Sequence, residues 1–354
     1  MARYFHRVSL SGPLANFPAV ILSALIVPFG FIALGRDAVW GWLGRLFAAL
    51  TGVFVKLLLL CVQFMSSWHW TAYRIPGPRT WVLAAFYVLL TLTALTAVAR
   101  RRWAIVLVVP LMVLAVICAT YPHSPQLTPG ALEVTLLDVG QGDAILVVFP
   151  DGRTLLVDGG GTYGAARIGG VRTGIDIGEQ VVSSYLWERG IRRLDVVALS
   201  HAHTDHLDGL NAVLENFAVR EFWYGRTVTT PAFQALASRA RGLGVRMTHR
   251  QRGEYFAWGG VTGIFLWPEV LTVTDQASNN DSLVFRLDYG GQVMLLPGDN
   301  EKSVEDELIT RQDPLHAEAL KVPHHGSRTS SSSELLAAAQ PRMVGVSVGE
   351  RNPF

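Results

Sequence analysis

The stretch His201-Ala202-His203-Thr204-Asp205-His206 decides more about this chain than any other segment. It directly follows residues 194–200, a mostly apolar run whose shortness, β-branched side chains and polar last residue are typical of a buried strand. Residues 207–214, which come next, have the pattern of a helix start. We therefore expect a strand, a polar loop and a helix in succession. In such a setting a rigid scaffold presents the side chains of a loop to a bound ion.

The residue types in this loop predict a metal site. Imidazole nitrogen and carboxylate oxygen suit zinc, manganese or iron, and so many donors are enough for a two-metal centre. A lone histidine here would be a cap or a surface residue. Three histidines and an aspartate in H-x-H-x-D-H spacing are hard to explain in either way. The motif therefore predicts four metal ligands: His201, His203, Asp205 and His206.

Charge and hydropathy divide the chain into two parts. Residues 1–125 contain ten Lys and Arg but a single acid, Asp37, so the remainder has a net charge of −7. This asymmetry indicates a membrane-embedded front and a soluble back. Four apolar segments look long enough to cross a bilayer, which takes ~20 mostly apolar residues. Tryptophans lie near their ends, as is usual at a membrane interface. These predicted spans are residues 17–34, 42–65, 81–99 and 103–121, with Trp40, Trp42, Trp68, Trp70, Trp81 and Trp103 at their ends.

The predicted organisation is a membrane region at 1–121, a Pro- and Gly-containing linker at 122–130 and a soluble domain at 131–354. The run Arg100-Arg101-Arg102 between the third and fourth spans favours a cytoplasmic loop. That orientation places the soluble domain on the extracytoplasmic side. Arginines on the opposite side of the spans act against this preference: Arg3, Arg7, Arg74 and Arg79.

In the soluble domain, strand and helix patterns alternate after a hairpin signal at Pro150-Asp151-Gly152-Arg153, which predicts a layered α/β sandwich. Two further polar clusters end predicted strands, Pro297-Gly298-Asp299-Asn300 and Pro323-His324-His325-Gly326-Ser327-Arg328. Alone, Asp299 would be a helix cap and the His pair surface residues. Together with the first motif, they predict a bridging carboxylate and a further imidazole ligand.

These motifs resemble the metallo-β-lactamase fold, in which H-x-H-x-D-H is followed by a Gly-Asp pair at a strand end and then by His. Three segments resemble soluble-domain signatures of the ComEC competence proteins, which are membrane channels of DNA uptake: residues 137–144 (LDVGQGDA), 280–284 (NDSLV) and 321–327 (KVPHHGS). Gly12-Pro13-Leu14-Ala15-Asn16 resembles the end of that family's membrane region. The resemblance implies α-helical transmembrane segments followed by a metallo-β-lactamase-like αββα sandwich.

The chain departs from the family pattern in two ways. His203 stands where many members have Asp. The His of this chain is closer to the general metallo-β-lactamase motif. The sequence also stops at Phe354, before a family loop that carries one more His, and it lacks the family's amino-terminal region and several spans. We therefore expect a partial copy of the architecture, truncated at both ends, with a C-terminally incomplete soluble domain.

The resemblance implies two divalent ions, zinc or manganese, with Asp299 bridging them. We favour His325 as the ligand and His324 as a catalytic residue that contacts substrate, although the sequence leaves open which of the two adjacent residues binds metal. Asp205 is the second candidate catalytic residue, because it could orient the attacking nucleophile. The complete predicted ligand set is His201, His203, Asp205, His206, Asp299 and His325.

Other residues are candidates for supporting roles. Ser327 and Arg328 are placed to meet a phosphate, and an exposed loop Ser and Arg is an equally good interpretation. The loop Gly140-Gln141-Gly142-Asp143 lacks the lysine and the spacing of a nucleotide-binding loop, so we expect a tight turn beside the metal pocket. Four residues are expected to support the ligands or to cap turns: Asp138, Asp143, Asp158 and Asn280.

The function implied by the resemblance is DNA uptake and natural transformation by a multi-pass protein of the plasma (inner) membrane. Its soluble domain would be a metal-dependent nuclease or phosphodiesterase acting on single-stranded DNA. The lipid bilayer and other DNA-uptake components are the expected partners. Two alternatives stay open: a metal-dependent esterase acting on a small or cell-envelope phosphodiester, and a non-catalytic channel fragment with a defective metal site.

The acidity of residues 126–354 does not favour avid DNA binding. Local basic patches could offset it, or these arginines could form a solvated face. The arginines concerned fall in two groups, Arg189, Arg192 and Arg193, and Arg239, Arg241, Arg246, Arg250 and Arg252.

Overall fold

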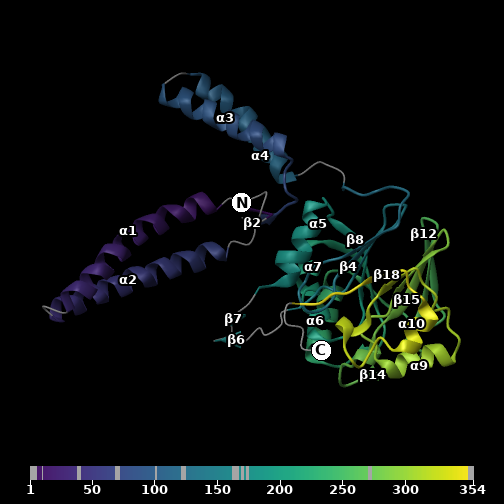
Figure 1. The fold of residues 1–354 in the computed structure, drawn as a ribbon. Helices are drawn as coiled ribbons and strands as arrows, with labels where there is room; N and C mark the ends of the chain where they lie inside the picture. Colours follow the sequence, from purple (N-terminus) through teal and green to yellow (C-terminus); the bar gives the residue numbers. More distant parts are fainter. Residues whose placement is uncertain are drawn as a thin grey trace. The chain divides into compact units, whose positions relative to one another are not determined.

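The computed structural model divides into two compact units, Met1–Pro122 and His123–Phe354 (Figure 1). It describes residues 6–9, 11–37, 41–67, 72–99, 102–120, 125–161, 167–168, 171–172, 175–269 and 273–349. Several sequence predictions fall on residues outside this description: Trp40, Trp68, Trp70, Arg100, Arg101, and the linker's first three residues at 122–124.

The first unit is built from four apolar helices, α1 Gly12–Asp37, α2 Gly41–Ser66, α3 Thr80–Val98 and α4 Trp103–Thr120. Helix α1 packs along α2 and α3 along α4 (Figure 1). Two short antiparallel strands accompany them, β1 Arg7–Ser9 and β2 Ala72–Arg74. Each helix overlaps one predicted span, and Tyr121, the last residue of the fourth span, lies outside the described residues.

Three of these helices are long and apolar enough to cross a membrane, over Leu14–Gly35, Gly41–Met65 and Thr80–Val98. Large apolar side chains on them are exposed, among them Phe17 at 73% and Leu95 at 61%, as expected of surfaces that face lipid. Helix α4 is a shorter apolar helix over Trp103–Cys118. Three of the four predicted spans therefore lie on helices of spanning length, and the fourth span stays a prediction.

The second unit contains two six-stranded sheets, in the orders β11-β9-β8-β5-β4-β3 and β12-β13-β15-β16-β17-β18. The strands of the first sheet are β3 Glu133–Leu136, β4 Ile145–Val148, β5 Thr154–Val157, β8 Arg193–Leu199, β9 Ala218–Tyr224 and β11 Arg246–His249. The strands of the second are β12 Tyr255–Trp258, β13 Val261–Trp267, β15 Val284–Tyr289, β16 Gln292–Leu296, β17 Ala319–Lys321 and β18 Met343–Gly345. The predicted hairpin is present, because β4 pairs antiparallel with β5.

Helices and short strand pairs complete this unit. A π-helical turn over Gly178–Ser183 leads into α5 Ser184–Glu188. The other helices are α6 Thr204–Leu207, α7 Leu210–Asn216, α8 Pro231–Gly242, α9 Lys302–Thr310 and α10 Ser333–Ala339, with 3-10 turns at Asn279–Asp281 and Pro323–Gly326. The short strands β6 Arg167–Ile168 and β7 Val171–Arg172 pair with each other, as do β10 Thr227–Val228 and β14 Val273–Thr274.

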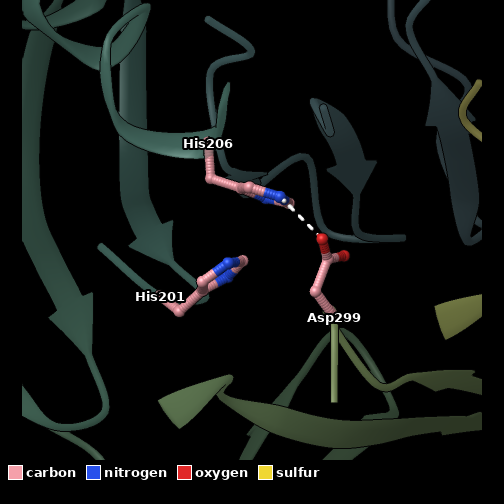
Figure 2. Close-up of side chains that lie close together, drawn as sticks. All are labelled: His201, His206 and Asp299. Atoms are coloured by element: carbon pink, nitrogen blue, oxygen red, sulfur yellow. Dashed lines mark hydrogen bonds and ion pairs between the residues drawn. The ribbon is translucent and has the colours of Figure 1, made fainter. Parts of the chain in front are cut away.

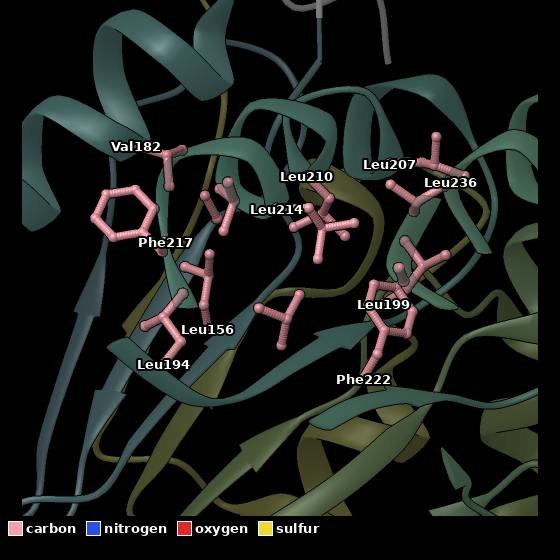
Figure 3. Packing of buried hydrophobic residues seen from close by; sticks show 14 of the residues in the cluster. Leu156, Val182, Leu194, Leu199, Leu207, Leu210, Leu214, Phe217, Phe222 and Leu236 are labelled. Atoms are coloured by element: carbon pink, nitrogen blue, oxygen red, sulfur yellow. The ribbon is translucent and has the colours of Figure 1, made fainter. Parts of the chain in front are cut away.

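Three apolar clusters separate four layers. Because side chains alternate along a strand, Leu146 of β4 joins the cluster beneath the helices of the first sheet, whereas Val147 joins the cluster between the sheets. A third cluster lies between the second sheet and helices α9 and α10, with Leu295 and Leu308 among its members. Figure 3 shows the first cluster, in which Leu210 and other helix residues meet the strand side chains. The unit is therefore an αββα sandwich, as predicted.

The strand directions bring the ends of four strands together. In the first sheet β5 and β8 are parallel, and in the second β16 and β17 are parallel. The carboxyl ends of parallel strands lie at the same edge of a sheet, and ligands are commonly bound there. The polar motifs follow these strand ends in the sequence, so the fold brings them to one end of the sandwich.

Candidate metal centre

Two imidazoles and a carboxylate form the middle of the cluster (Figure 2). His201 follows β8, His206 lies on α6, and Asp299 follows β16. One ligand atom from each lies within 4.8 Å of the others, and Nε2 of His206 is 3.1 Å from Oδ2 of Asp299. All three side chains are buried. Residues from both sheets thus converge on one point.

His325 adds a third imidazole to this cluster. Its Nε2 lies 3.1 Å from Oδ2 of Asp299 and 3.7 Å from Oδ2 of Asp205. Its Nδ1 donates to the carbonyl oxygen of Ser347 at 2.9 Å, which orients the ring. Asp205, His206 and His325 form a second group of potential ligands that overlaps the first.

His324 has a different orientation from its neighbour. Its Nδ1 lies 3.2 Å from the hydroxyl of Thr329 and 3.7 Å from Glu301. His324 and His325 both have left-handed backbone angles, with φ of 46° and 54°, which non-glycine residues adopt at a cost of about 1–3 kcal/mol. This backbone turn lets adjacent side chains face different surroundings. The geometry brings His325, rather than His324, to the potential ligands.

Asp158 supports His206 from behind. Its carboxylate accepts hydrogen bonds from the backbone and the hydroxyl of Ser200 at 2.7 and 2.6 Å, and its Oδ2 lies 2.8 Å from Nδ1 of His206. Carboxylates commonly orient metal-binding imidazoles through the nitrogen that does not bind metal. The contact therefore directs Nε2 of His206 towards Asp299, and support of a metal ligand by Asp158 stays a prediction.

Lys321 at the end of β17 is a buried ammonium that sequence reasoning did not single out. It forms ion pairs with Asp143 and with Oδ1 of Asp299, the latter at 3.0 Å, and donates to the carbonyl oxygen of Gly298 at 3.1 Å. These carboxylates hold its pKa above the usual value despite burial. Because Lys321 engages Oδ1, the other oxygen of Asp299 faces His206 and His325.

Burial and carboxylates set the protonation of the imidazoles. Burial lowers the pKa of His206, but Asp299 and Asp158 outweigh it and hold that pKa well above its usual value. Burial also lowers the pKa of His325, but its interactions with the carboxylates of Asp205 and Asp299 raise that pKa more, to about 9. Burial, helped by His206, holds the pKa of His201 well below its usual value. Without a bound ion, His201 is therefore neutral, whereas His206 and His325 carry protons that neighbouring carboxylates stabilise.

This donor set fits a divalent cation. Imidazole nitrogens and carboxylate oxygens are the ligands that zinc and manganese take in proteins. Four carboxylates surround the cluster, and Lys321 is the ammonium that pairs with two of them. Oδ1 of Asp143 is also buried with no hydrogen-bond partner among the described residues, as expected of a group beside a cation site. The four carboxylates are Asp143, Asp158, Asp205 and Asp299.

Two of the predicted residues lie at the margin of this cluster or outside it. His203 is adjacent, with its Nδ1 2.9 Å from Nε2 of His201, while its own Nε2 lies 3.2 Å from the carbonyl oxygen of Ala277. Asp138 is exposed and accepts a hydrogen bond from the backbone of Gly140, so it caps its own turn instead of supporting a ligand.

The remaining predicted residues lie on neighbouring loops. Asn280 accepts a hydrogen bond from the backbone of Glu301 at 3.0 Å and donates to the hydroxyl of Ser303, so it holds the start of α9. Neither of these bonds joins it to a predicted metal ligand. The hydroxyl of Ser327 lies 3.1 Å from that of Thr329, and Arg328 is exposed. Both residues are near His325 in sequence, and their contact with a phosphate stays a prediction.

The loop 140–143 lies directly against the metal-binding motif. Gly142 has a φ of 101°, and a Cβ at this position would lie 2.0 Å from the carbonyl oxygen of Asp205. Only glycine combines this conformation with so close an approach. The expectation of a tight turn beside the metal pocket is therefore confirmed.

The model of the metallo-beta-lactamase superfamily matches residues 137–342, which is more than half of the chain. The chain belongs to the metallo-beta-lactamase superfamily. The model of the family described as "Competence protein" matches residues 1–100. A competence region followed by a metallo-beta-lactamase domain is consistent with the ComEC family and confirms the resemblance.

Characterised relatives match nearly the whole chain. ComE operon protein 3 of Bacillus subtilis (strain 168) is 29% identical over 367 residues, covering 99% of this chain and 45% of that protein. Recombination protein 2 of Haemophilus influenzae is 29% identical over 378 residues, covering 99% of this chain and 43% of that protein. This metallo-beta-lactamase superfamily chain thus spans less than half the length of these relatives. The solved metallo-beta-lactamase fold protein YhfI from Bacillus subtilis aligns with a TM-score of 0.35 and 13% identity, over 62% of this chain and 98% of YhfI.

Proposed function

We propose that this chain acts in DNA uptake, and that its soluble unit hydrolyses a phosphodiester bond in DNA with two divalent ions, zinc or manganese. The observation that carries the proposal is the convergence of buried nitrogen and oxygen donors from the ends of both sheets. His201, His206 and Asp299 form its centre, with Asp205 and His325 in overlapping groups.

The surroundings of the ligands support this role. When bound, divalent ions provide a nucleophile at neutral pH and stabilise charge on phosphoryl oxygens. Asp158 and the Ser347 carbonyl hold the rings of His206 and His325 in place, and Lys321 fixes Asp299. These contacts are of the kind that preorganises a catalytic site before substrate arrives.

Asp205 and His324 are proposed to meet the substrate. The side chain of Asp205 is 26% exposed, whereas those of His206 and Asp299 are almost fully buried. Burial would raise the pKa of Asp205, but the hydrogen bond from His325 and the charge of His206 lower it below the usual range. Asp205 thus remains a carboxylate that can orient a water molecule. The side chain of His324 is 10% exposed and lies beside Glu301, and its proposed contact with substrate rests on its place next to His325 in the sequence.

The family match and the apolar helices support DNA and a membrane as partners. The competence model covers residues 1–100, and three helices are long and apolar enough to span a bilayer. We propose a multi-pass protein of the inner membrane with its soluble unit on the extracytoplasmic side. Its proposed partners are single-stranded DNA, the lipid bilayer and other components of DNA uptake.

One observation favours a second candidate, an esterase that acts on a small or cell-envelope phosphodiester. The net charge of −7 over residues 126–354 opposes avid binding of a long polyanion. The two candidates share the metal centre and differ in the preferred substrate.

The test uses the full chain purified in detergent and supplied with Mn²⁺ or Zn²⁺. We expect it to shorten a 5′-labelled single-stranded oligonucleotide, and we expect Asp299→Asn to abolish the reaction. Asp138→Asn, which alters an exposed acid outside the cluster, should leave cleavage unchanged. Cleavage of bis-p-nitrophenyl phosphate that excess oligonucleotide does not inhibit would favour the second candidate. A folded, metal-loaded chain that cleaves neither substrate would overturn both candidates.

A further inference from the structure

A second cavity lies away from the metal centre, between the edge strands of the two sheets. It has a volume of about 540 Å³, within the range of small-molecule sites, and is lined from β11 and β9 on one side and β12 on the other. Asp195 lines it near the start of β8, whereas His201 follows the end of that strand. Six residues of extended chain, about 20 Å, therefore separate the cavity from the metal centre along β8.

Arginine donors outnumber the acceptors in this cavity. Four arginines line it together with two acids, Asp195 and Glu221. Both acids are already engaged by the protein. Glu221 accepts from Trp223 at 2.9 Å and from Thr248 at 2.6 Å, and Asp195 accepts from the backbone of Thr154 at 2.9 Å. The four arginines are Arg153, Arg220, Arg246 and Arg250.

Three of these arginines keep donors that face solvent, whereas Arg250 is 19% exposed and pairs with Glu254 at 3.0 Å. Each guanidinium carries five N–H donors and no acceptor. Arg246 uses one nitrogen to bond Glu221 at 2.5 Å, and its side chain is 64% exposed. Arg153 is 46% exposed beside Asp151, and Arg220 is exposed. The surplus of donors calls for an anion, and a phosphate accepts forked contacts from arginine particularly well.

The wall on the β12 side is aromatic. Phe256 and Trp258 line the cavity, and the guanidinium of Arg153 lies over the Trp258 ring, 5.4 Å from its centroid. Trp258 is held by Phe149 and Trp223, with ring centroids 5.0 and 5.4 Å away. A nucleobase stacks readily on a guanidinium plane or an indole ring. The cavity therefore offers one surface for a phosphate and another for a base.

We propose that this cavity is a non-catalytic binding site for a nucleotide, with the phosphate held by Arg220 and Arg246 and the base against the Arg153–Trp258 surface. The nucleotide is either free in solution or one unit of a single DNA strand. The site does not depend on the metal centre, because the described residues of the two sites are different. Binding at the cavity can therefore be measured with the metal removed.

The experiment measures binding to the full chain in detergent and EDTA, with three probes: dAMP, ribose 5-phosphate and a fluorescein-labelled dT15 oligonucleotide. The test variant is Arg153→Gln/Arg220→Gln, which changes two exposed side chains. The matched control is Arg239→Gln/Arg241→Gln, which alters two arginines of α8 that do not line the cavity. Arg220→Gln alone serves if the double variant folds poorly.

We expect the double variant to bind dAMP, dT15 or both at least tenfold more weakly, while the control binds as the wild type does. Loss of dAMP binding alone would identify a free nucleotide, and loss of dT15 binding alone a unit of a strand. Ribose 5-phosphate should bind at least tenfold more weakly than dAMP when dAMP binds. The proposal is overturned if no probe distinguishes the cavity variant from the control, or if ribose 5-phosphate binds as tightly as dAMP. None of these outcomes bears on cleavage at the metal centre.

Discussion

At the scale of single residues, one contact sets the direction of His206. Asp158 is fully buried and lies 2.8 Å from Nδ1 of His206, while Nε2 faces Asp299. Changing Asp158→Asn removes the charge but keeps the size of the side chain. We expect the metal affinity to fall about 10- to 100-fold, as is usual when a carboxylate behind a ligating imidazole is lost. Titration with Zn²⁺ monitored by calorimetry checks this, and an unchanged affinity would show that Asp158 does not support a ligand.

Lys321 is the second residue whose contribution can be measured. Changing Lys321→Met leaves the buried carboxylates of Asp143 and Asp299 without their ammonium. Breaking a buried ion pair in this way destabilises proteins by about 3–5 kcal/mol. Thermal unfolding in EDTA should therefore show a clear loss of stability. Lys302→Met is the matched control, because Lys302 is 58% exposed beside Glu334 and should contribute little. Equal stability of the two variants would contradict the account.

The site residues that could be predicted carry a metal-binding side chain in a recognisable motif, whereas Lys321 does not. His201, Asp205 and His206 lie in one loop, so their spacing alone indicates a shared ion. Lys321 pairs with Asp143 and Asp299 from distant parts of the chain. A lysine in a short strand has no local feature that predicts burial, so only the tertiary structure shows its role.

At the scale of elements, the glycine loop 140–143 and the metal-binding loop depend on each other. Gly142→Ala would place a Cβ 2.0 Å from the carbonyl oxygen of Asp205 at a φ of 101°. We expect this change to displace Asp205 and weaken metal binding at least tenfold. Gly253→Ala is the control, since Gly253 also has a positive φ, of 86°, but open space around it. It should cost about 1–2 kcal/mol of stability and leave metal binding intact. Metal titration of both variants decides, and equal affinities would contradict the inferred contact.

Most strands that line the sandwich could be predicted because they are short apolar runs. The predicted hairpin at Pro150-Asp151-Gly152-Arg153 joins β4 to β5, and the apolar run before His201 forms β8. Strand β9, Ala218–Tyr224, has a weaker sequence signal, because Arg220 and Glu221 interrupt its apolar pattern. Those two residues line the cavity between the edge strands of the two sheets.

At the scale of the whole molecule, the apolar helices predict how the chain behaves in a cell. Three helices of spanning length carry exposed apolar side chains that only lipid or another apolar surface can cover. We expect the chain to stay in the membrane pellet after an alkaline carbonate wash, which strips peripheral proteins. Recovery in the supernatant would contradict the membrane assignment.

The most direct test of the central claim is the metal content of the purified full chain, measured by elemental analysis after loading with Zn²⁺ or Mn²⁺ and desalting. The account predicts two ions per chain in the wild type. It predicts fewer in Asp299→Asn, which alters the carboxylate shared by His206 and His325, and two again in Asp138→Asn. A wild-type chain that retains one ion or none would contradict a two-metal hydrolytic centre.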